Sequence, residues 1–252
     1  MDEGLREMGN NMVEIYKEPL KIELDGTKLH VNGAPHPSSV RKLGQMQEVL
    51  MQHVEPKSEE DFNTYWMYRK VYFSNNIRFD ITLLPARMLG GEYMKTYGHY
   101  HPKAQDGSSL GYPEIYQVLK GKAIFILQEK NKDGSVNVTV QDANEGDIAI
   151  MPPGNGHVTV NNGIEDIILS NLVYDNFESE YEDYKIYRGA AFYATEEGLK
   201  QNTEYLVKKF SRIKATEFIK KYGITVRDLL KEFYSNPEKF AFLEKPGLLF
   251  GR

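Results

Sequence analysis

The sequence predicts a mainly β protein in which a barrel or sandwich of short strands is flanked by helices. Between about residues 71 and 174, apolar residues recur with a period of two, which is typical of strands with one buried face. Asp-Gly, Glu-Gly, Pro-Gly and Asn-Gly pairs separate these runs and indicate turns. Before and after this region the apolar spacing becomes helical.

Residues 1–70 are expected to form an arm and helices that pack on the strands. Between residues 39 and 53, apolar residues follow a serine N-cap at helical spacing: Val40, Leu43, Met46, Val49 and Leu50. A second helix is expected from Ser58, because Ser58 and Asp61 resemble a capping box before Phe62 and Trp66.

Residues 71–200 contain the expected strands. The clearest run places four apolar residues in alternation with polar ones: Ile77, Phe79, Ile81 and Leu83. In the run 114–120, Glu114 and Tyr116 project to one side, and Ile115, Gln117 and Leu119 to the other. Further strands are expected at residues 123–127, 136–140, 148–151, 158–160 and 167–173.

Residues 201–252 are expected to form a helical extension that packs on the strands. After Thr203 the helical spacing involves Leu206, Phe210, Ile213, Phe218 and Ile219. Thr225 is the expected cap of a helix over residues 226–234, and Pro237 is the expected stop.

The composition limits the classes of function. The 252 residues are 40% apolar and 27% charged, without a run of about 18 apolar residues, so a transmembrane role is excluded. The acidic start lacks the pattern of a secretory signal, and a cytoplasmic location is expected. The chain has no cysteine, so a metal would have nitrogen and oxygen ligands only. A net charge of -5 argues against a nucleic acid partner.

Two of the six histidines stand one residue apart in the strand-rich centre. On an extended segment, His99 and His101 point to the same face and lie close enough to share an ion. A second pattern consists of Gly146, five residues, residues 152–154 (PPG), two residues, His157, three residues and Asn161.

Together these patterns resemble the two motifs of the cupin superfamily, G-x5-H-x-H-x(3–4)-E-x6-G and G-x5-P-x-G-x2-H-x3-N. The resemblance implies a jelly-roll barrel, the cupin double-stranded β-helix. It also implies one metal ion, held by His99, His101, Glu114 and His157. The second motif matches at every spacing.

The first motif departs from the pattern in two ways. Tyr93 stands where its leading glycine belongs, and twelve residues separate His101 from Glu114. Glu114 nevertheless keeps the expected six-residue spacing to Gly121, and residues 107–111 are interpreted as an inserted loop. Glu92 and Glu129 are weaker candidates because neither precedes a glycine at that distance.

Within the superfamily, residues 16–198 are most similar to the cupin-type glucose-6-phosphate isomerases. The resemblance is carried by residues 16–19 (YKEP), 39–43 (SVRKL), 96–101 (TYGHYH) and 114–122. It implies that the following residues contact the sugar phosphate: Thr82, Thr96, Gly98, Tyr116, Tyr174 and Tyr68. Glu114 is the expected catalytic residue, because a carboxylate at the edge of the metal's coordination sphere can move the proton between C1 and C2. Tyr72 is an alternative to Tyr68. Where the family has a histidine sometimes assigned to ring opening, this chain has Glu182.

The expected function is therefore metal-dependent interconversion of glucose 6-phosphate and fructose 6-phosphate, with roles in glycolysis and gluconeogenesis. Three imidazoles and one carboxylate suit Fe(II), with Mn(II), Ni(II) or Zn(II) as alternatives, better than calcium. A homodimer that covers exposed strand edges is expected from the resemblance. The alternatives are an isomerase of another phosphosugar such as mannose 6-phosphate, a metal-dependent oxygenase and a non-catalytic sugar-phosphate binder.

Overall fold

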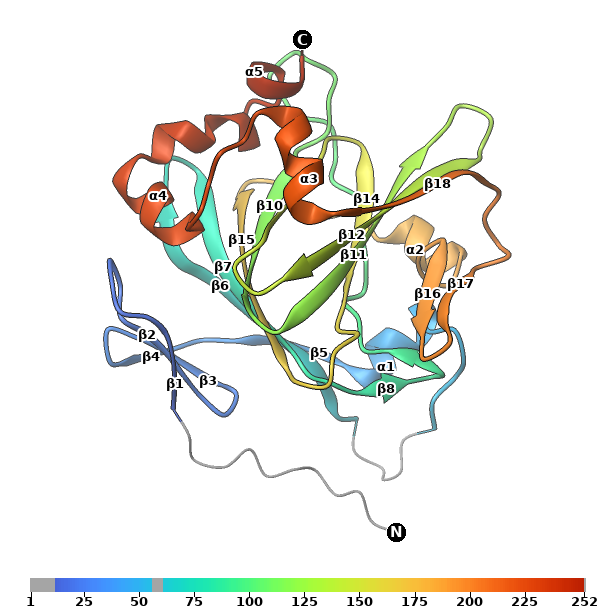
Figure 1. The fold of residues 1–252 in the computed structure, drawn as a ribbon, viewed down its shortest axis with the longest axis horizontal. Coiled ribbons are helices and arrows are strands. Elements are labelled where there is room, and N and C mark those ends of the chain that lie inside the picture. The colour runs from blue at the N-terminus through green and yellow to red at the C-terminus, as the bar shows by residue number, and fades with distance from the viewer. Residues whose placement is uncertain (1–11, 56–60, 252) are drawn as a thin grey trace.

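The computed structural model describes residues 12–55 and 61–251, and it confirms a mainly β fold with helices at its flanks (Figure 1). The largest sheet has six antiparallel strands in the order β13-β10-β15-β7-β6-β5. In chain order these strands are β5 (Ser39–Lys42), β6 (Asn63–Ser74), β7 (Ile77–Leu84), β10 (Glu114–Lys120), β13 (Ile148–Met151) and β15 (Ile167–Tyr174).

A four-stranded sheet forms the second layer, in the order β14-β11-β12-β18. Its strands are β11 (Lys122–Lys130), β12 (Val136–Asn144), β14 (Asn155–Val160) and β18 (Val207–Lys214). β18 runs parallel to β12, whereas the other pairs of this sheet are antiparallel. Within the described residues, the hydrogen-bonded strands of the two layers form open sheets and not one closed ring.

Smaller elements surround these layers. A four-stranded N-terminal sheet consists of β1 (Val13–Tyr16), β2 (Ile22–Asp25), β3 (Lys28–Val31) and β4 (Ala34–His36). Two-stranded pairs are formed by β8 (Met88–Leu89) with β9 (Glu92–Tyr93), and by β16 (Phe192–Thr195) with β17 (Gly198–Gln201). The helices are α1 (Leu43–Met46), η1 (Gln47–Val49), α2 (Glu182–Ile186), α3 (Ala215–Phe218), η2 (Ile219–Tyr222), α4 (Leu229–Ser235), η3 (Pro237–Leu243) and α5 (Gly247–Phe250).

The strands β7, β10, β13 and β15 of the six-stranded sheet are buried on both faces. On its outer face, the Tyr16 ring of β1 packs edge-on against Phe79 of β7, and Tyr72 of β6 packs edge-on against Phe233 of α4. Gln117 holds the start of α4, because its amide donates to the Arg227 carbonyl at 2.9 Å and accepts from the Leu229 amide at 3.0 Å. The other face of the sheet is therefore left for the functional site.

The expected helix over residues 39–53 is only partly correct. Residues 39–42 form β5, and only short helical turns, α1 and η1, follow. Leu43, Met46, Val49 and Leu50 are buried as expected. Ser58 lies outside the described residues, but Trp66 lies in strand β6 and not in a helix. Residues 39–42 pair with the edge of β6 that β7 does not cover. The hydrogen bonds of this pairing outweigh the local helical spacing.

The expected helix after Thr203 is also wrong at its start. Residues 207–214 form β18, whose backbone pairs with the open edge of β12. Leu206 and Phe210 are 71% and 48% exposed, so their spacing does not reflect a buried helix face. Helices do follow from Ala215, but the cap of α4 is Asp228 and not Thr225. Pro237 opens η3, directly after α4 ends.

The described part of the chain contains no helix with the length and apolar character that a membrane crossing requires.

Candidate metal centre

His99 and His157 are brought together by backbone pairing. The segment before β10 runs antiparallel to β14, and His99 and His157 stand directly opposite each other in this pairing. The His99 amide donates to the His157 carbonyl at 3.2 Å, and the His157 amide donates back at 3.0 Å. His101 lies two residues further along this extended segment, so its ring points to the same side as that of His99. Their Nε2 atoms are 3.0 Å apart.

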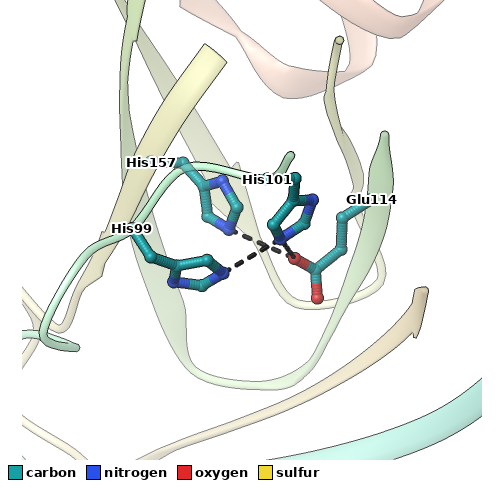
Figure 2. Close-up of side chains that lie close together, drawn as sticks. All are labelled: His99, His101, Glu114 and His157. Atoms are coloured by element: carbon teal, nitrogen blue, oxygen red, sulfur yellow. Dashed lines mark hydrogen bonds and ion pairs between the residues drawn. The ribbon is translucent and has the colours of Figure 1, made fainter. Parts of the chain in front are cut away.

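Glu114 reaches the same point from the opposite sheet. It is the first residue of β10, which is held between β13 and β15. Figure 2 shows the three imidazoles and the carboxylate converging from separate segments of the chain. One ligand atom from each of the four residues lies within 4.8 Å of the other three.

The distances within this cluster suit a shared ion. Two ligand atoms that are each about 2.1 Å from one metal are about 3.0 Å apart at a right angle and about 3.4 Å apart at the tetrahedral angle. Glu114 Oε2 lies 3.4 Å from His101 Nε2 and 3.2 Å from His157 Nε2. Together with the 3.0 Å between His99 and His101, these values span the expected range.

Hydrogen bonding also prepares the imidazoles as ligands. His101 Nδ1 lies 2.9 Å from the Tyr112 carbonyl, which can only accept, so Nδ1 carries the proton and Nε2 keeps a free lone pair. Among the described residues, Nδ1 of the buried His157 has no hydrogen-bond partner, and Nε2 has only the approach of Glu114 Oε2 at 3.2 Å, without hydrogen-bond geometry. Buried polar atoms normally have a partner, and a metal ion at Nε2 would supply one. The donor set of three nitrogens and one oxygen therefore fits a divalent metal.

The electrostatics of the cluster favour neutral imidazoles at His99 and His101 beside an ionised Glu114 carboxylate. Burial, followed by the charge that His157 and His101 would carry, lowers the pKa of His99 well below its ordinary value. Burial is also the main cause that lowers the pKa of His101, to about 4. Burial alone would raise the pKa of Glu114, but its interaction with His157 and then the charge of His101 lower it. Neutral imidazoles and a carboxylate are the protonation states that bind a metal.

Polar side chains line the inner face of the six-stranded sheet beside the cluster. Tyr116 shares the face of Glu114, and its ring centre lies 6.0 Å from that of His157. Asn171 of β15, directly opposite Tyr116, donates from its amide to Glu114 Oε1 at 2.7 Å. Asp80 of β7 stands opposite Asn171 and accepts from Arg78 at 2.7 Å. Asn171 and Arg78 were not expected as site residues, although both are polar side chains at inward positions of largely apolar strands.

Aromatic rings form a wall next to His101. The Phe177 ring centre lies 4.6 Å from that of His101, and Tyr112 stacks on Phe177 at 5.0 Å. The Tyr174 ring stacks on the Tyr112 ring, with ring centres 4.8 Å apart. Tyr174 also stacks on Phe177, with ring centres 6.5 Å apart, so a single aromatic ring links Tyr174 to His101.

The other expected substrate contacts surround the cluster in different ways. Thr82 shares the inner face of β7 with Asp80 and is buried. Thr96 Oγ1 accepts from the Thr159 amide at 3.0 Å, next to the pairing of His99 with β14. Gly98 has a φ of +86°, and a Cβ there would lie 2.4 Å from the Tyr184 ring. Close packing thus requires glycine at this position, and any contact of Gly98 with substrate stays a prediction.

The structure does not bring Tyr68 to the site. Tyr68 pairs with Ile81, which faces away from Thr82, and its hydroxyl donates to the Thr27 carbonyl at 2.8 Å. Tyr72 also faces outward, toward α4. The inward tyrosine of β6 is Tyr65, which was not expected at the site. It lies three positions before Tyr68, and an odd number of positions along a strand reverses the face.

The hydroxyl of Tyr65 accepts from the Tyr97 amide at 3.2 Å and from Arg41 at 3.4 Å. Glu182 is exposed at the first position of α2 and is not part of the metal-ligand cluster of the described structure. Glu92 pairs instead with the buried Lys95 at 2.8 Å, and Glu129 lies on the exposed end of β11. Among the carboxylates considered, only Glu114 joins the histidines in the described structure.

These features define a mainly β protein with a three-histidine, one-carboxylate metal site between two sheets. The family model for glucose-6-phosphate isomerase (GPI) matches residues 56–208, more than half of the chain, and the chain belongs to this family. The glucose-6-phosphate isomerase of Pyrococcus furiosus is 30% identical over 160 residues, which cover 62% of this chain and 78% of that protein. That of Thermococcus litoralis is 28% identical over 163 residues, which cover 62% and 79%.

Among solved structures, a Bacillus subtilis oxalate decarboxylase is similar with a TM-score of 0.32 and 20% identity, over 50% of this chain and 29% of that one.

Proposed function

We propose that this chain is a metal-dependent aldose-ketose isomerase that interconverts glucose 6-phosphate and fructose 6-phosphate. The observation that carries the proposal is the convergence of His99, His101, Glu114 and His157 in a chain that belongs to the GPI family. We propose Fe(II) as the bound metal because imidazole nitrogens with one carboxylate suit it, and Mn(II), Ni(II) and Zn(II) share this preference. Calcium is disfavoured because it takes six to eight oxygen ligands.

The reaction moves a hydrogen between C2 and C1 of the open-chain sugar. A divalent ion held by the four residues would act as a Lewis acid, stabilising negative charge that develops on the neighbouring sugar oxygens. Glu114 is the proposed base that takes the proton from C2 and returns it to C1, while the hydroxyl proton of O2 is lost and O1 gains a proton. The nearby carboxylate of Asp80 is not available for this task, because it already accepts from Arg78 and from the Lys70 amide at 2.8 Å.

The sugar phosphate needs a second set of contacts. We propose that Thr82, Thr96, the backbone at Gly98, Tyr116 and Tyr174 line the substrate site, as the family resemblance implies. Tyr116 is the best supported of these, because it is buried on the same face as Glu114 and beside His157. Tyr65 replaces Tyr68 in this proposal, since Tyr65 faces inward.

Two further properties belong to the proposal. A sugar phosphate is charged and does not cross membranes freely, which supports a cytoplasmic location. β18 is an edge strand that is exposed along most of its length. Exposed edges of this kind need covering, which supports a homodimer.

The decisive experiment measures isomerisation with and without metal. Purified protein is stripped by a chelator, reconstituted separately with Fe(II), Mn(II), Ni(II) and Zn(II), and assayed by coupled detection of fructose 6-phosphate. We expect activity to disappear on stripping and to return with metal, and His157→Gln to remain inactive. His53→Gln is the matched control, because His53 is a largely exposed histidine outside the cluster. Full activity of the stripped protein would refute the proposal.

Further measurements on the reconstituted protein separate the alternative functions. Faster turnover of mannose 6-phosphate would identify an isomerase of another phosphosugar, and oxygen consumption would identify an oxygenase. When fructose 6-phosphate is converted in deuterium oxide, incorporation of solvent deuterium at C2 of the glucose 6-phosphate product is expected for proton transfer through Glu114. Complete retention of the substrate hydrogen would instead indicate a hydride shift and would remove Glu114 as the base.

A further inference from the structure

Asn171 is a polar residue on the inner face of β15, which is otherwise apolar. On the same inner face, its neighbours two residues away are Leu169 and Val173, both buried. Only 5% of the surface of Asn171 is exposed, yet its amide nitrogen lies 2.7 Å from Glu114 Oε1. Burying an amide is costly unless it makes a hydrogen bond, so this contact explains why the position tolerates asparagine.

The contact gives the two carboxylate oxygens of Glu114 different partners. Oε1 accepts from Asn171, whereas Oε2 lies 3.4 Å and 3.2 Å from the Nε2 atoms of His101 and His157. Rotation of the carboxylate about its last bond would exchange these oxygens. The amide must present its nitrogen, since its oxygen would repel the carboxylate.

The neighbouring strand β7 does not compete with Glu114 for the Asn171 amide. Asp80 stands directly opposite Asn171 on β7 and could compete for the amide. Its carboxylate is occupied on both oxygens, because Oδ2 accepts from Arg78 at 2.7 Å and Oδ1 accepts from the Lys70 amide at 2.8 Å. The Asn171 amide is thus directed to Glu114, which lies on the adjacent strand.

We propose that Asn171 is a positioning residue of the metal centre, which holds Glu114 so that Oε2 alone faces the three imidazoles. A carboxylate fixed in this way binds metal without first losing rotational freedom. Removal of such supporting hydrogen bonds typically weakens metal affinity or activity about 10- to 100-fold. The inference deepens the proposed function and rests on the metal centre described there.

The test compares Asn171→Leu and Asn171→Ala with the wild-type chain. Leucine fills the space of the amide and alanine leaves it empty, so an effect that the two share reports loss of the hydrogen bond. Ser170→Ala is the control, because Ser170 is the adjacent buried residue on the outer face of β15. Metal-free proteins are titrated with Co(II), and affinity is measured with a competing chelator together with the visible absorption of the bound ion.

We expect both Asn171 variants to bind Co(II) about 10- to 100-fold more weakly, with an altered visible spectrum, and Ser170→Ala to match wild type. With saturating Co(II), kcat for glucose 6-phosphate should fall while KM stays nearly constant, because Asn171 acts through Glu114. Wild-type affinity and spectrum in both variants would overturn the inference. Failure of both metal-free variants to fold would also overturn it, since Asn171 would then serve the fold.

The proposed function can fail separately. If wild type binds Co(II) but isomerises no sugar phosphate with any metal, the isomerase proposal fails, while the affinity measurements still decide the role of Asn171. If wild type does not bind Co(II), the positioning role fails with the metal centre.

Discussion

Gly98 links the packing of the chain to the geometry of the metal centre. We therefore expect Gly98→Ala to lower both the stability of the protein and its affinity for metal. The residue has a φ of +86°, where a side chain costs about 1–2 kcal/mol. An added Cβ would lie 2.4 Å and 2.5 Å from two atoms of the Tyr184 ring. Tyr184 is completely buried, so its ring has little space into which to move.

Overpacking of this kind costs about 1–3 kcal/mol, so the sum with the backbone strain is about 2–5 kcal/mol of unfolding free energy. For a chain of this size, the melting temperature should fall by roughly 4–20 °C. Gly98 also precedes His99, whose backbone pairs with His157. We therefore expect weaker metal binding in addition to lower stability.

Gly134→Ala is the matched control. Gly134 has a φ of +82°, but apart from its chain neighbours no atom of the described residues lies within 4 Å of the position of its Cβ. The Gly134→Ala variant should lose only the unfolding free energy that backbone strain costs, about 1–2 kcal/mol, and should bind metal like wild type. Urea unfolding of the metal-free proteins measures both free energies. If Gly98→Ala lost no more stability than Gly134→Ala, the close approach of Tyr184 would not control this position.

Three further substitutions test other parts of the structure. Tyr68→Phe should lower the unfolding free energy by about 0.5–1.5 kcal/mol through loss of the bond to Thr27, with KM for glucose 6-phosphate unchanged; a large rise in KM would return Tyr68 to the substrate site. Gln117→Leu should leave buried backbone groups at the start of α4 unpaired, at a cost of about 1–3 kcal/mol, and limited proteolysis should then cut the C-terminal helices faster; an unchanged cleavage rate would contradict this anchoring role. A side-chain hydrogen bond from Ser135 is the main cause that lowers the pKa of Asp133 to about 2, so the ionised Asp133 stabilises the fold above pH 3.8 and this contribution is lost as the pH falls toward 2. The difference in unfolding free energy between wild type and Asp133→Asn should therefore shrink over that range, and a constant difference would contradict this prediction.

The strand region and the histidine cluster could be predicted because their signals are local. Alternation with a period of two places side chains on one face wherever the strand lies in the fold. His99 and His101 needed only an extended backbone to share a face, and that backbone is present. The long gap before Glu114 could be interpreted as a loop, and residues 107–111 do form one.

The misassigned elements are those whose conformation depends on a distant partner. Leu206, Phe210 and Ile213 have helical spacing, yet β18 pairs with β12, which precedes it by about 70 residues. An unpaired strand edge offers a row of hydrogen bonds to the backbone, and this gain outweighs a weak local preference. Trp66 likewise joins the sheet because β6 is held between β5 and β7.

The sequence by itself determined the types of the metal ligands and their spacing along the chain, since a motif specifies which side chains are present and which face of a local segment they share. The tertiary structure alone decided that Asn171, 57 residues from Glu114, holds that carboxylate, and that Tyr65 instead of Tyr68 faces the site. Strand order and register set both outcomes, because they determine which strands become neighbours and which face of each strand turns inward.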